Sequence, residues 1–135
     1  MIRLVGAAFA LVAVMACTTT AFERRGYDLE GKDQNSVSCG AAVKFRYDLA
    51  RQEHASFGTI EAKEPGMGMH CNQDFVLSTF LREACALKAD LVNITDEAKP
   101  DIWSSCYRAT AEYIRFAKKP KGLRTDAQYL SSVGQ

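Results

Sequence analysis

The sequence is poor in the residues that most enzymes use for chemistry. It contains two histidines, His54 and His70, one tryptophan and three prolines among 135 residues. No Cys-x-x-Cys pair is present, which argues against a thioredoxin-type redox site and against a four-cysteine zinc site. Catalysis needs a nucleophile with a base, paired carboxylates or a metal cluster, and no such spacing occurs. We therefore expect a protein that is not an enzyme and carries no cofactor.

The sequence also lacks an excess of charge of either sign. Its 17 Lys+Arg and 16 Asp+Glu give a formal net charge of +1. A domain that binds nucleic acid through the phosphate backbone normally carries a clear positive excess on one surface. We therefore expect no nucleic-acid partner.

A long apolar run lies near the start of the chain, at residues 4–16, after the positive charge of Arg3. Its length is that of the apolar region of a secretory signal peptide, and it is too short to span a bilayer as a mature anchor. The run ends in Val14-Met15-Ala16-Cys17, which resembles the lipobox at which bacterial lipoproteins are cleaved and acylated. We expect residues 1–16 to be a lipoprotein signal peptide and Cys17 to carry the acyl chains; the alternative is an ordinary secretory signal with a chance cysteine.

The residue after the acylated cysteine bears on the destination of such a protein. In lipoproteins with this signal, Asp at that position favours retention in the inner membrane, and here the position holds Thr18. We therefore expect a lipid anchor in the outer membrane, with the folded part in the periplasm. The following residues, to position 37, show no apolar periodicity and are predicted to be a tether between membrane and domain.

Four further cysteines predict two disulfides, because an exported chain reaches an oxidising compartment. The sequence alone allows three pairings. Cys39 precedes one predicted strand and Cys106 begins another, so neighbouring strands could bring them within the ~5.5–6 Å Cα separation of a disulfide. This leaves Cys71 with Cys85, a pair that can form only if the helix between them begins late.

Hydrophobic periodicity predicts an α+β domain over residues 38–117. Period-two alternation and β-branched runs indicate strands, and an apolar stripe that ends at Lys88 indicates one helix. The predicted order is ββαββ, with the helix packed on a four-stranded sheet and the first two strands antiparallel. The predicted strands are residues 43–49, 57–62, 91–95 and 106–116, and the helical stripe is Leu77, Phe80, Leu81, Ala84 and Leu87.

The chain after the domain, residues 118–135, is predicted to be a basic linker and tail. Lys118, Lys119, Lys121 and Arg124 form a basic run that either contacts anionic lipid headgroups or acts as a solubilising tail. The pattern from Thr125 to Gln128 is typical of a capping box and predicts a short, loosely attached helix.

Several short segments resemble those of a known group of proteins. The segments are Ser38-Cys39, Phe57-Gly58-x-Ile60, Leu81-Arg82-x-x-Ala84, Lys88-Ala89-Asp90-Leu91-Val92 and Cys106-Tyr107-Arg108-Ala109. Together they resemble the small bacterial envelope lipoproteins related to the Rcs stress-sensor lipoprotein of enteric bacteria and to the YbjQ-type domain. The resemblance implies a small sheet with one packed helix, a disulfide between Cys39 and Cys106, and a role as a sensor or accessory subunit beside another envelope protein. The positions of Cys71 and Cys85 depart from that pattern.

One group of large side chains is a candidate contact for the partner protein. Ile102, Trp103 and Tyr107 lie close together in the sequence, in and after a predicted loop. They could form an exposed patch that binds another envelope protein. Alternatively, Trp103 could cover the open end of the domain.

A second group of side chains offers an alternative function. Met67, Met69 and His70 lie in a glycine-rich loop next to Cys71. Thioether and imidazole groups are soft ligands that suit Cu(I), which an exported protein can meet. The alternative is therefore a periplasmic copper-binding lipoprotein.

Overall fold

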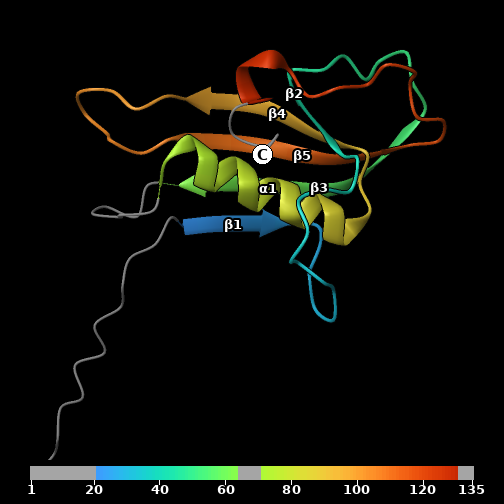
Figure 1. Ribbon diagram of the computed structural model, residues 1–135, viewed down its shortest axis with the longest axis horizontal. Coiled ribbons are helices and arrows are strands. Elements are labelled where there is room, and N and C mark those ends of the chain that lie inside the picture. Colours follow the sequence, from blue (N-terminus) through green and yellow to red (C-terminus); the bar gives the residue numbers. More distant parts are fainter. Residues whose placement is uncertain (1–20, 64–70, 131–135) are drawn as a thin grey trace, which may run out of the picture.

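One α-helix crosses one face of a five-stranded sheet in the computed structural model (Figure 1). The structure describes residues 21–63 and 71–130. The α+β class with one main helix is confirmed, but the described residues form five strands instead of four. In chain order the elements are β1 (Ala21–Arg25), β2 (Ala42–Phe45), β3 (His54–Lys63), α1 (Gln73–Leu87), β4 (Leu91–Ala98), β5 (Arg108–Phe116) and the short 3-10 helix η1 (Ala127–Tyr129).

The sheet is mixed, with the strand order β1-β3-β5-β4-β2. β2 pairs with β4 in parallel, and all other neighbours are antiparallel. We predicted that the strands now labelled β2 and β3 would pair with each other in antiparallel fashion. This prediction is wrong, because β4 and β5 lie between them in the sheet. We call the face that carries α1 the helix face and the opposite face the open face.

The left-handed conformation of Arg46, whose φ is 47°, explains why β2 is shorter than predicted. Val43 and Phe45 pack in the core on the helix face. Beyond Arg46, Tyr47 and Leu49 pack instead with a second cluster on the open face. The apolar residues thus keep their spacing of two, but those before Arg46 face the helix face and those after it face the open face. After Arg46 the chain crosses the sheet toward β3 and does not form an antiparallel neighbour of β2.

Helix α1 has clear signals at both ends. The Asn72 carboxamide oxygen accepts a hydrogen bond from the Phe75 N–H at 2.8 Å, which caps the N-terminus. Lys88 adopts a left-handed φ of 58° and ends the helix. The predicted apolar stripe is buried against the sheet, as expected. Within the described ranges, no helix is long and apolar enough to cross a membrane.

The two disulfides connect different partners from those predicted. Cys39 bonds Cys85, and Cys71 bonds Cys106, with Cα separations of 5.5 and 4.9 Å. β2 runs parallel to β4, so Cys39 lies at the end of the sheet where α1 finishes and β4 begins. β5 begins at the other end, beside the start of α1. The predicted pairs Cys39–Cys106 and Cys71–Cys85 are therefore wrong; the second would also have to span ~20 Å along a helix that begins at residue 73.

The predicted tether contains β1, which corrects the N-terminal boundary of the domain. β1 pairs with β3 along its whole length, with Ala21 opposite Lys63 and Arg25 opposite Thr59. The segment alternates only weakly in hydrophobicity, because Phe22 and Arg24 both point to the helix face. Periodicity therefore gave no signal for a strand here.

The predicted tail also belongs to the domain in part. The Asp126 N–H donates to the Val43 carbonyl, and the Asp126 carboxylate accepts from the Phe45 N–H, both at 2.9 Å. These bonds satisfy the outer edge of β2. Thr125 does not cap η1 as predicted, because its hydroxyl oxygen accepts the Val43 N–H at 3.1 Å. Tyr129 is fully buried in the helix-face core, so the segment is docked and not loosely attached.

The strand pairing defines two ends of the sheet. Ala21 pairs with Lys63, and Ala98 pairs with Arg108, so these residues share one end, which we call the entry end. At the opposite, far end, His54 pairs with Phe116. Figure 1 shows β1 starting and the β4–β5 loop projecting on the same side.

Candidate functional site

The most exposed apolar side chains of the described residues lie at the entry end. Ile102 is 90% exposed and Trp103 is 88% exposed, in the loop that joins β4 to β5. We call these two residues the loop tip. Trp103 does not cover the open end of the domain, because it is almost fully exposed to solvent.

The loop that carries the tip is ordered by a carboxylate. One Asp101 oxygen accepts the N–H groups of Trp103 and Ser104, both at 2.8 Å, and the Asp101 N–H donates to the Ser104 carbonyl at 2.8 Å. These backbone hydrogen bonds hold the pKa of Asp101 below its usual value. Cys106 then ties the base of the loop to Cys71. The tip is therefore presented by a folded turn.

Tyr107 does not belong to the exposed patch, contrary to the prediction. It is 1% exposed, and its hydroxyl donates a hydrogen bond to the Glu97 carboxylate. The same carboxylate oxygen accepts the Tyr129 hydroxyl at 3.1 Å. Burial, and then the hydrogen bond to Glu97, raises the pKa of Tyr107 above its usual value. Both tyrosines therefore stay protonated, and they connect η1 to the end of β4.

A buried carboxylate attaches β1 to the helix. Glu83 of α1 is 1% exposed. The Arg24 guanidinium donates to both of its oxygens at 2.7 Å, and the Tyr27 hydroxyl donates to one of them at 2.7 Å. This bidentate geometry is among the stronger forms of charged hydrogen bond. Both oxygens of the Glu83 carboxylate thus accept hydrogen bonds from side chains of the same domain, which gives this carboxylate a structural role.

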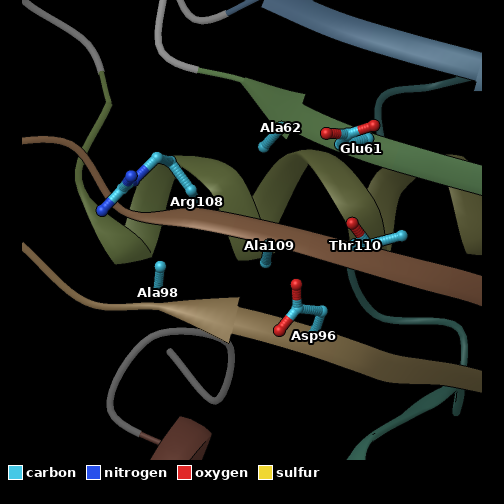
Figure 2. Close-up of a pocket in the computed structure, with 7 residues that line it drawn as sticks. All are labelled: Glu61, Ala62, Asp96, Ala98, Arg108, Ala109 and Thr110. Atoms are coloured by element: carbon cyan, nitrogen blue, oxygen red, sulfur yellow. The ribbon is translucent and has the colours of Figure 1, made fainter.

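The open face carries a shallow polar hollow near the entry end (Figure 2). Pairing places Glu61, Thr110 and Asp96 in one row across β3, β5 and β4. Arg108 lies at one end of the hollow, and α1 lies behind the sheet in this view. The hollow measures about 180 Å³, whereas pockets for small organic ligands usually measure roughly 300–1,000 Å³. The hollow is therefore small for a substrate pocket, but its polar side chains can form hydrogen bonds with a molecule that lies on the surface.

Several predicted site residues fall outside the described residues. These are the acylation candidate Cys17 and the three predicted copper ligands Met67, Met69 and His70. The neighbouring Cys71 is in a disulfide, so it has no thiolate to offer a metal. Among residues 21–63 and 71–130, no group of three or more His, Cys, Asp or Glu side chains could hold a metal ion.

Comparisons of the chain with protein-family models, with curated proteins and with solved structures gave no match. Function is therefore argued from the residues and their arrangement.

Two structural details around the site were not predicted from the sequence. Asp side chains in loops accept hydrogen bonds from backbone N–H groups two residues further on, so Asp101 could have indicated an ordered loop. Glu83 lies three residues after Phe80 and four before Leu87, within the buried stripe of α1. A carboxylate at such a position requires a cationic or hydroxyl partner, although the sequence does not identify Arg24 as that partner.

Proposed function

We propose that this protein is an outer-membrane lipoprotein, acylated at Cys17, whose domain acts without catalysis as a sensor or accessory subunit for another envelope protein. The observation that carries the proposal is the cysteine pairing. The four cysteines of the described residues pair with one another, and Cys17 is the fifth. That pattern fits an exported chain with one cysteine set aside for acylation.

The disulfides suit a small domain in the periplasm. They close loops with sequence separations of 46 and 35 residues. In the chain-entropy model, each such loop contributes roughly 4 kcal/mol to the free energy of unfolding. A sheet covered by one helix has a modest core, so this contribution is a large part of the total stability.

The open face is the surface that we expect the partner protein to bind. Near the far end it is covered by the chain that crosses from β2 to β3, whose Tyr47 and Leu49 pack with Ile114. Near the entry end the row of Glu61, Thr110 and Asp96 remains uncovered and partly exposed. Non-obligate protein contacts are about as polar as the rest of a protein surface, so a polar surface of this kind can form one.

Photo-crosslinking in intact cells tests this proposal. A photoreactive residue at Glu61 samples the open face, and one at Asp74, which is exposed on α1, samples the opposite side. We expect a discrete protein adduct from position 61 and none from position 74. Mass spectrometry of the purified protein should show an acylated Cys17. An unacylated protein, or an acylated one that gives no adduct from position 61, contradicts the proposal.

The copper-binding alternative stays a prediction, because no described residue favours it. Titration with Cu(I) under reducing and under oxidising conditions tests it directly. Absence of submicromolar binding in both conditions would exclude Met67, Met69 and His70 as a copper site.

A further inference from the structure

The loop tip and the point where the chain enters the domain lie at the same end of the sheet. Ala21, the first residue of β1, pairs with Lys63. The β4–β5 loop leaves the sheet at Ala98 and returns at Arg108, which pair with each other at that end. Figure 1 shows β1 starting on the side toward which this loop projects.

The sequence limits how far this end can lie from the proposed acyl chains. Cys17 precedes Ala21 by four residues. Four residues span at most ~14 Å even when fully extended. An acylated Cys17 at the membrane surface therefore holds the entry end close to the lipid headgroups.

The chemistry of the tip fits such a position. Tryptophan favours the boundary between headgroups and acyl chains, because its ring is apolar and its N–H can bond to polar groups. The adjacent Ile102 supplies a further apolar side chain, and Lys99 on the same loop is exposed and can meet lipid phosphates. The turn held by Asp101 orders the tip before contact, which reduces the entropy lost on binding.

We propose that Ile102 and Trp103 insert into the headgroup region of the bilayer that holds the acyl chains of Cys17, so that the domain stands end-on on the membrane. This inference rests on the proposed acylation. A partner protein at the tip would have to fit between the entry end and a membrane no more than ~14 Å from Ala21. The bilayer is therefore the occupant that the chain geometry favours.

The protein offers a direct probe, because Trp103 is its single tryptophan. The full, lipidated protein is reconstituted in phosphatidylcholine–phosphatidylglycerol vesicles, and its acylation is verified by mass spectrometry. With brominated phosphatidylcholine in the vesicles, we expect Trp103 emission to shift to shorter wavelength and to lose most of its intensity. Iodide in the aqueous phase should quench it weakly.

A matched control moves the probe to the far end. In the variant Trp103→Phe/Arg51→Trp, the tryptophan occupies an exposed position in the chain that crosses toward β3. We expect this probe to be quenched by iodide and not by brominated lipid. Circular dichroism and disulfide mapping confirm that both proteins are folded.

The outcomes separate the two proposals. An acylated, vesicle-bound protein whose Trp103 is open to iodide and insensitive to brominated lipid overturns the insertion of the tip and leaves the anchor intact. A photo-crosslink from position 102 to a protein in cells, in place of lipid, also overturns it. A protein without acyl chains overturns both proposals.

Discussion

At the scale of single residues, the buried Glu83 and the half-buried Glu97 attach segments of this chain to one another. Glu83 accepts hydrogen bonds from Arg24 of β1, and Glu97 accepts them from Tyr107, which directly precedes β5, and from Tyr129 of η1. A buried carboxylate without partners would cost several kcal/mol, so Glu83 requires Arg24 and Tyr27 to be in place. Both carboxylates are therefore engaged in contacts between segments of the fold.

The contact between Arg24 and Glu83 predicts a difference between two neighbouring arginines. Arg24→Ala leaves the Glu83 carboxylate buried with only the Tyr27 hydroxyl, and we expect a loss of about 3 kcal/mol, the low end of the range for breaking a buried ion pair. Arg25→Ala is the control, because Arg25 pairs with the exposed Glu23. Denaturant unfolding measures both variants. Equal effects would contradict the structural role of Arg24.

Asp101 predicts how the loop tip responds to pH. Its folded-state pKa is lowered by the Trp103 and Ser104 N–H groups, so its stabilisation of the turn is complete above its usual pKa of 3.8 and is lost as the pH falls through the lowered value. NMR should show the two amide resonances shifting together, with a midpoint below pH 3.8. Asp101→Ala should remove this titration and speed amide exchange at both positions. Asp101→Asn keeps one acceptor oxygen and should retain slow amide exchange at Trp103 and Ser104. Fast exchange at these two amides in Asp101→Asn would contradict the idea that the acceptor oxygen by itself orders the turn.

At the scale of elements, the sequence predicts what depends on local periodicity and fails where distant segments meet. The stripe of α1 and the strands after it follow from spacing of apolar residues. The β2–β4 pairing does not, because β3 and α1 separate the two parallel strands in the chain and no turn joins them directly. The change of face at Arg46 was hidden for a related reason, since arginine rarely adopts positive φ. Ile102 and Trp103 are exposed, as the predicted patch requires. Tyr107 was predicted to be exposed but is buried, because the sequence does not show whether a large side chain next to a loop faces solvent or the core.

The disulfides give the element-scale prediction. Peptide mapping without reduction should recover Cys39 linked to Cys85 and Cys71 linked to Cys106. The double variant Cys39→Ala/Cys85→Ala should lose roughly 4 kcal/mol of stability while amide exchange at Trp103 stays unchanged. Cys71→Ala/Cys106→Ala should lose a similar amount and also loosen the loop tip, because its base is released. The same exchange at Trp103 in both variants would contradict that coupling.

At the scale of the whole molecule, the basic run and the proposed anchor lie at opposite ends. β5 ends at Phe116, opposite His54, so Lys118 and the cations after it follow the far end. β3 places this end ~30 Å from Lys63. If Cys17 is acylated, an end-on domain holds the basic run beyond the reach of the same membrane surface. The alternative of a solubilising tail is then favoured over contact with headgroups.

Orientation on the membrane makes this argument testable. The variant Lys118→Gln/Lys119→Gln/Lys121→Gln removes three positive charges from the far end. We expect the lipidated variant to bind vesicles with the same dependence on anionic lipid and on salt as the parent, because a charge held ~30 Å from a surface is several Debye lengths away at physiological ionic strength. Lys99→Gln, one charge on the loop of the tip, is the comparison and should weaken the dependence on anionic lipid. A larger effect of the triple variant would show that the domain lies on its side or inverted, with the far end against the bilayer.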